Sequence, residues 1–235
     1  IKKSLFMLKP SWNCIRSIYS VGLPAIIAQA LMSVMTYGMN MILGGISENA
    51  VTAYGLYYKV QQFVLFAAFG LRDAITPITA FSYGRGNRQR INDGIKYGLI
   101  YTCVIMAAGM VLLEIFADAV AGLFGLSGET MGLCVGAVRV ISAGFIAAGV
   151  NIALQGVFQA LNSGIGSLVV SLCRQLVFVL PTAWLLSGTV SSSEDMWRVW
   201  IAFPVAEVVT MIIAVLLMRK VYRKRAAVSD DTAQK

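Results

Sequence analysis

The chain is a series of long apolar stretches separated by short polar connections, and this pattern limits it to a lipid environment. About 20 consecutive apolar residues are enough for a helix to cross a bilayer. Residues 117–128 are amphipathic and too short to cross, so we expect them to lie at the interface. Six other stretches are long enough, and we predict an all-α integral membrane protein with spans at residues 18–43, 51–83, 94–116, 129–161, 166–186 and 196–218.

Composition excludes most soluble classes of protein. Hydrophobic residues make up 58% of the 235 residues and charged residues 13%, against about 45–50% and about 25% in soluble domains. The chain has no His, no Cys-x-x-Cys pair and no nucleophile motif. We therefore expect neither an enzyme nor a metal site, and no cofactor.

The distribution of charge predicts the orientation. Basic residues concentrate in the flank 1–16, in the loop holding Arg85, Arg88 and Arg90, and in the basic then polar tail 220–235. The positive-inside rule places these segments, and both termini, in the cytoplasm, with residues 17–219 as a six-helix lobe of the cell membrane. The basic loop lacks interleaved aromatic residues, so nucleic acid is not an expected partner. The alternate connections hold acidic residues, namely Glu48, Asp118, Glu129, Glu194 and Asp195.

Two ionisable residues lie deep inside predicted spans. Glu207 is near the middle of the sixth span and Arg174 lies within the fifth. A charge in the bilayer needs a partner, a wet cavity or a function. Because the spans are consecutive and antiparallel, we predict that Arg174 and Glu207 pair, either as part of the coupling machinery or as a purely structural pair. A neutral hydrogen-bond network around Glu207 is the other interpretation.

Arg72 and Asp73 lie toward the cytoplasmic half of the second span. Adjacent helical residues point about 100° apart, so we expect these two not to share a face. One hypothesis is a gate or an anchor to another lobe. The alternative is a helix end whose charged side chains extend to the interface.

Two spans carry polar residues at helical spacing. Gln29, Met32 and Asn40 share a face of the first span, which suits a cavity for varied substrates or ordinary packing. The fourth span repeats an amide at i, i+4 and i+8. Such amides line water or hold helices together; here they are Asn151, Gln155 and Gln159.

Five stretches together resemble the multidrug and toxic compound extrusion (MATE) family. The resemblance depends on their order and spacing, and it includes Arg85 where the family usually has Ala. The stretches are residues 22–29 (GLPAIIAQ), 69–88 (FGLRDAITPITAFSYGRGNR), 156–161 (GVFQAL), 171–181 (SLCRQLVFVLP) and 202–207 (AFPVAE).

The resemblance implies a fold and a function. Family members have twelve spans in two lobes, and the match is to spans seven to twelve, the C-terminal lobe. The expected partners are an N-terminal six-helix lobe, the lipid bilayer and small amphipathic substrates. The implied activity is export of amphipathic, often cationic compounds by alternating access, coupled to H⁺ or Na⁺.

The coupling acid is expected outside this lobe. Some members resemble sodium antiporters with acidic residues in the seventh and tenth spans, whereas residues 22–40 and 144–161 here contain no Asp or Glu. Glu207 is then the one deep carboxylate of this lobe.

Two alternatives to the antiporter remain open. One is a flippase of lipid-linked precursors from the same superfamily, for which Arg139 and Arg174 are too few to make a strongly cationic cavity. The other is a truncated or structural six-helix membrane protein without transport activity. Dependence of efflux on an ion gradient separates the antiporter from both.

Overall fold

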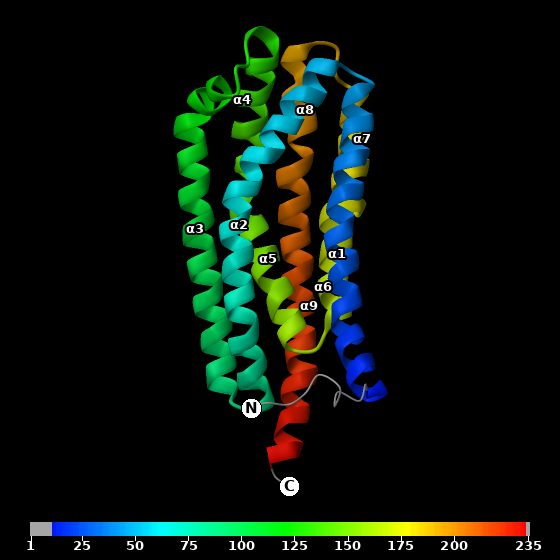
Figure 1. Cartoon of the computed structure of the whole chain (residues 1–235), viewed down its shortest axis with the longest axis vertical. Helices are drawn as coiled ribbons and strands as arrows, with labels where there is room; N and C mark the ends of the chain where they lie inside the picture. Colours follow the sequence, from blue (N-terminus) through cyan, green and yellow to red (C-terminus); the bar gives the residue numbers. More distant parts are fainter. Residues whose placement is uncertain (1–10, 234–235) are drawn as a thin grey trace, which may run out of the picture.

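The chain folds into a bundle of long helices. The computed structural model describes residues 11–233, with side chains to residue 223, and those residues contain no strand. Figure 1 shows the helices running along one long axis. They are α1 (Trp12–Gly44), α2 (Glu48–Gly84), α3 (Arg88–Leu123), α4 (Gly128–Ser142), α5 (Phe145–Ala160), α6 (Gly164–Leu172), α7 (Val179–Ser187), α8 (Trp197–Trp200) and α9 (Ala202–Ala233), with a π turn at Cys173–Val177 and a 3₁₀ turn at Ser193–Met196.

Side-chain caps begin the second and third helices. The Ser47 side chain accepts a hydrogen bond from the backbone N–H of Asn49 at the start of α2, and Asn87 accepts one from Arg90 at the start of α3. Such caps satisfy backbone donors that a helix start leaves unpaired. Pro77 lies inside α2 without ending it.

The number of membrane-length helices confirms the predicted fold class. Within the described residues, five segments are long and apolar enough to cross a bilayer, and a bent pair, α4 with α5, makes a sixth. The span predicted at residues 129–161 corresponds to this bent pair, in which the helix axis turns by 56° between Ser142 and Phe145. Gly144 lies in the turn, and a Cβ there would sit 2.9 Å from the Cα of Pro204. The bend thus occurs where α9 approaches the backbone closely.

Two other predicted segments continue the helices that precede them. Residues 117–123 of the predicted interfacial segment 117–128 form the end of α3, where Ala117 and Ala121 are buried. Helix α9, which contains the last predicted span, continues into the tail 220–235 as far as Ala233. Residues 1–10 of the N-terminal flank lie outside the described residues.

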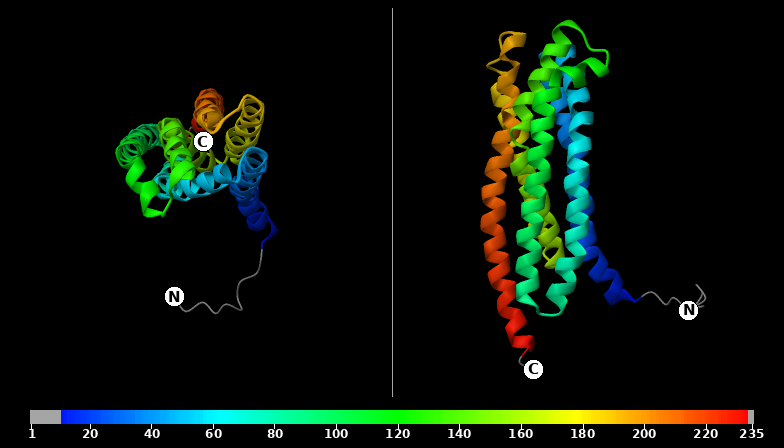
Figure 2. Two further views of the ribbon diagram at one scale, coloured as in Figure 1. Left: turned by 90° about the horizontal axis from the view of Figure 1, so that it is seen from above. Right: turned by 90° about the vertical axis from the view of Figure 1, so that its left-hand side faces the viewer.

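Helix α5 forms the centre of the bundle. It packs against α2, α3, α6 and α9, and nearly all of its side chains are buried. Small residues allow this packing: a Cβ on Gly149 would lie 2.6 Å from the Cγ of Met106 on α3. Figure 2 shows the bundle end-on and from the side, with the other helices placed around this position.

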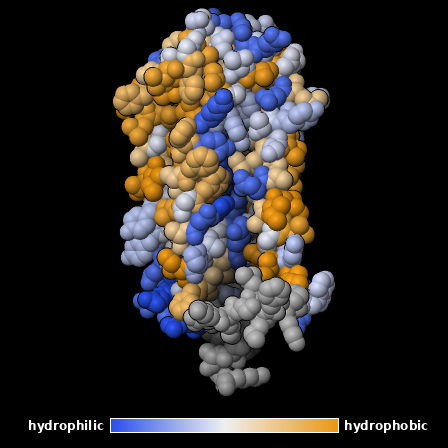
Figure 3. Space-filling view, in the orientation of Figure 1, coloured by the Kyte–Doolittle hydropathy of each residue, from blue (hydrophilic) through white to orange (hydrophobic). Residues whose placement is uncertain are grey.

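Large apolar side chains are exposed over much of the surface, and the face seen in Figure 3 carries a polar band. Many large apolar side chains are exposed, as expected for helices in contact with lipid. Figure 3 shows a hydrophilic band running lengthwise between α1 and α2 with hydrophobic surface on both sides. The most exposed of the apolar side chains are Leu123, Phe63, Trp12, Ile165, Ile18, Tyr37, Ile115, Trp184 and Leu185.

Candidate functional site

A buried ion pair joins α9 to the π turn. The Nε of Arg174 lies 2.5 Å from the Oε1 of Glu207, and the two side chains are only 10% and 12% exposed. The predicted pairing of these residues is therefore confirmed. The π turn adds one residue per turn to the helix that α6 begins, and it buries both Arg174 and Gln175. Such turns are found frequently at functional sites.

Asn151 completes the coordination of Glu207. Its Nδ2 donates to the Oε2 of Glu207 at 2.9 Å and to the backbone carbonyl of the same residue at 3.0 Å. Both carboxylate oxygens therefore have a donor, one charged and one neutral. The Oδ1 of Asn151 is buried and has no partner among the described residues.

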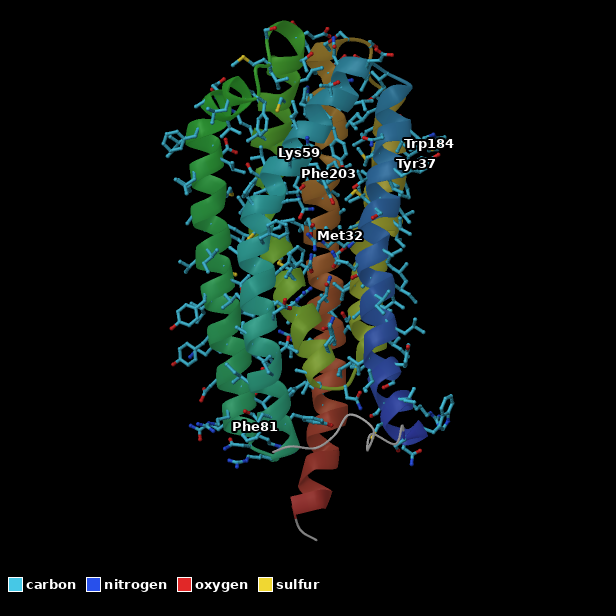
Figure 4. All side chains as sticks on the ribbon, in the orientation of Figure 1. Met32, Tyr37, Lys59, Phe81, Trp184 and Phe203 are labelled. Atoms are coloured by element: carbon cyan, nitrogen blue, oxygen red, sulfur yellow. The ribbon has the colours of Figure 1, made fainter. Side chains whose placement is uncertain are left out.

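A small polar pocket lies beside the pair. Its volume is about 90 Å³, and Arg174 is in its wall while Glu207 is not. Both α1, through the exposed Gln29, and α2, through Phe69, contribute to its lining. Figure 4 shows Met32, another residue of the lining, in front of α9. The full lining is Ala25, Ala28, Gln29, Met32, Phe69, Arg72, Gln155, Gln159, Ser171, Arg174 and Gln175.

Three buried polar groups of the lining have no partner among the described residues. They are the Nε2 of Gln155, the Oγ of Ser171 and the Oε1 of Gln175. These residues are 5%, 1% and 6% exposed. A buried donor or acceptor without a partner costs about 1–3 kcal/mol, so the wall is built to face polar contents.

Arg72 reaches the pocket because α5 has a glycine opposite it. A Cβ on Gly156 would lie 2.5 Å from the Cγ of Arg72 and 2.7 Å from the Oγ1 of Thr76. We expected Arg72 and Asp73 not to share a helix face, and their side chains are 19% and 67% exposed, but the two side chains nevertheless meet. Both the Nε and the Nη2 of Arg72 contact the Oδ1 of Asp73, at 2.9 and 2.8 Å. The long arginine side chain turns back along the helix, and Asp73 stays 67% exposed.

The other sequence candidates divide between the pocket and the packing. Gln29 donates to the Sδ of Met32 at 3.4 Å, and Gln159 donates to Ser167 at 3.1 Å, all near the pocket. Asn40 is not brought to it; its buried Oδ1 lacks a partner among the described residues. No group of three or more His, Cys, Asp or Glu suited to a metal ion occurs in the described residues.

Sequence reasoning missed two polar residues of the pocket. Ser171 and Gln175 flank Arg174 and lie four positions apart, which is the spacing of one helix face. Two polar residues beside a deep arginine in an apolar span were the signal that could have found them. This pattern predicts polar lining from the fifth span as well as from the first and fourth.

Comparison with known proteins identifies the fold and the family. The family model described as MatE matches residues 24–185 of the chain. The chain belongs to the MatE family. Multidrug export protein MepA of Staphylococcus saprophyticus is 24% identical over 217 residues, covering 92% of this chain and 48% of that protein. MepA of Staphylococcus haemolyticus is 23% identical over 222 residues, with 94% and 49% covered.

About half of each of two solved transporter structures shares the fold of nearly this whole chain. An outward-facing multidrug resistance MATE family transporter of the MOP superfamily has a TM-score of 0.86 at 22% identity, over 98% of this chain and 51% of that one. A MOP superfamily transporter from Pyrococcus furiosus has a TM-score of 0.85 at 23% identity, over 98% and 50%. The chain thus spans about half the length of the MatE family relatives it matches.

Proposed function

We propose that this chain is the C-terminal lobe of a multidrug exporter that moves amphipathic, often cationic compounds out of the cell. The observation that carries the proposal is the charged and amide-rich interior of Arg174, Glu207 and Asn151 inside a bundle of membrane-length helices. Ionisable residues within membrane spans are rare and mark substrate and ion pathways. Relatives named as multidrug export proteins support the assignment.

A second six-helix lobe is the proposed partner. The curated relatives are about twice as long as the part that this chain matches. The hydrophilic band between α1 and α2 is the face that we assign to the partner (Figure 3). Alternating access would follow from rocking of the two lobes about the cavity between them. The basic loop at Arg85 and both ends of the segment are assigned to the cytoplasm.

The coupling ion, H⁺ or Na⁺, is proposed to act mainly on an acid of the partner lobe. In this lobe both oxygens of Glu207 are already bound, by Arg174 and by Asn151. The Arg174–Glu207 pair then holds α9 against the π turn. Glu207→Gln should lower the efflux rate and leave the dependence of efflux on the ion gradient in place. The exposed control Glu194→Gln should leave both the rate and the gradient dependence unchanged.

The experiment has two steps. The intact mass of the native polypeptide tells whether both lobes are in one chain, since 25.3 kDa corresponds to this segment alone. Efflux of a cationic dye is then measured in cells making that polypeptide, with the proton gradient or the sodium gradient collapsed in turn. Loss of efflux in one of the two conditions is expected. Efflux that ignores both collapses overturns the antiporter and favours one of the alternatives.

The flippase alternative gains little from the geometry. Arg72 joins Arg174 at the pocket, but each arginine contacts an acid and the pocket is only about 90 Å³. A lipid-linked precursor needs a much larger cationic cavity. A structural protein without transport activity would leave dye efflux unchanged when the chain is deleted.

A further inference from the structure

We propose that the polar pocket binds one small anion, a halide ion or a carboxylate group, between Arg72 and Arg174. This site goes beyond the proposed export of amphipathic compounds and does not depend on it. Two guanidinium groups in the lining, buried polar groups without a partner among the described residues, and a small volume carry the proposal.

The charges of the lining are all positive. Arg72 and Arg174 are the ionisable side chains among the described residues that line the pocket. Their acidic partners, Asp73 and Glu207, are not part of the lining, and Asp73 is 67% exposed. Low-dielectric walls with one sign of charge concentrate the electric field. The charged groups that face the pocket are therefore guanidinium groups, and the acid that pairs with each of them lies outside the lining.

The neutral groups of the wall supply donors for the same ligand. The Nε2 of Gln155 and the hydroxyl of Ser171 are buried without a partner among the described residues. Both can donate to an anion that the guanidinium groups hold, and charge-assisted hydrogen bonds of this kind are the strong ones. The Oε1 of Gln175 is an acceptor, and a half-turn of that amide presents its NH₂ group instead.

The volume limits the ligand to a small one. The pocket measures about 90 Å³, whereas sites for drug-sized molecules measure about 300–1,000 Å³. One water molecule occupies about 30 Å³ in the liquid. A halide with a water molecule, or a carboxylate group entering past Gln29 and Met32, fits this space. The body of an exported compound does not.

The anion would compete with Glu207 for one guanidinium. Arg174 lines the pocket and also contacts the Oε1 of Glu207 at 2.5 Å. Removing the carboxylate charge leaves Arg174 without its counter-ion. Glu207→Gln should then tighten anion binding, whereas Arg72→Gln should weaken it.

The test is a titration of the purified intact protein in lipid nanodiscs, and isothermal titration calorimetry measures the binding. The probes are sodium bromide and sodium acetate. Each replaces the sodium salt of a bulky sulfonate in the buffer, so that the sodium concentration stays constant. We expect saturable binding to the wild type and to the control Arg139→Gln, whose arginine pairs with Asp118 at the surface. Arg72→Gln should bind about tenfold more weakly or worse, the loss expected for one charge-assisted contact.

The outcomes also identify the source of the anion. Saturation by bromide alone assigns the site to a free inorganic anion, and displacement of bromide by acetate and longer carboxylates assigns it to the head group of an amphiphile. Absence of saturable binding, or equal effects of Arg72→Gln and Arg139→Gln, overturns the proposal. If Arg72→Gln does not fold, wild-type crystals soaked in bromide decide: an anomalous peak between Arg72 and Arg174 supports the site, and its absence refutes it.

Discussion

Neutralising the Arg174–Glu207 pair one residue at a time should destabilise the bundle far more than removing both residues together. Arg174→Met leaves a carboxylate that is 12% exposed without its cation, and Glu207→Met leaves a guanidinium that is 10% exposed without its anion. Removing one partner of a buried ion pair costs about 3–5 kcal/mol, whereas replacing both with apolar side chains is often neutral or stabilising. Exposure this low leaves little solvent to screen the remaining charge.

The neighbourhood of the pair supports the recovery in the double variant. When Glu207 is replaced, the Nδ2 of Asn151 loses the carboxylate at 2.9 Å but keeps the backbone carbonyl of residue 207 at 3.0 Å. No further donor is orphaned by the second substitution. We therefore expect a coupling energy of about 3 kcal/mol or more between the two positions.

The assay is reversible unfolding in mixed micelles, followed by circular dichroism, for the wild type, both single variants and the double variant. The control cycle uses the exposed pair Arg139–Asp118, whose side chains are 51% and 65% exposed, and should give about 0.2–1 kcal/mol. Neutral hydrogen bonds within membranes average about 0.6 kcal/mol. A coupling energy near that value at Arg174–Glu207 would show that the pair is solvated and would refute the reasoning.

Two glycine substitutions test the close helix contacts. Gly144→Ala places a Cβ 2.9 Å from the Cα of Pro204; a backbone atom cannot move aside, so we expect a loss of about 1–3 kcal/mol in the same unfolding assay. Gly156→Ala places a Cβ 2.5 Å from the Cγ of Arg72 and should cost a similar amount while weakening bromide binding in the calorimeter. Gly132→Ala, which meets no atom within 4 Å, is the matched control and should be neutral or stabilising, and equal losses at all three positions would contradict the packing argument.

The sequence predicts the membrane-length helices well because apolar length is a local property. Each span needs only its own residues to be recognised, and the depth of Arg174 and Glu207 follows from their positions within spans. The pairing of these two residues followed as well, since consecutive antiparallel helices leave few partners for a buried charge.

The features that the sequence did not predict depend on contacts between distant segments. The bend at Gly144 occurs where Pro204, 60 positions away, approaches the backbone. No residue pattern in the sequence distinguishes the π turn at Cys173–Val177 from an ordinary α-helical turn. The contact between Arg72 and Asp73 depends on a side chain that turns back along its helix, which a projection of Cα directions does not describe.

The length of the helices has a mechanical consequence. Helix α2 has 37 residues without a break, about 55 Å at about 1.5 Å per residue, while the hydrocarbon core is about 30 Å thick. Such a rod acts as a lever with arms that extend beyond the lipid on both sides. A rigid tilt of about 10° around its middle displaces each end by about 5 Å, given that length. Small rotations at the level of the buried pair therefore become movements at the two membrane surfaces that are comparable to one turn of a helix.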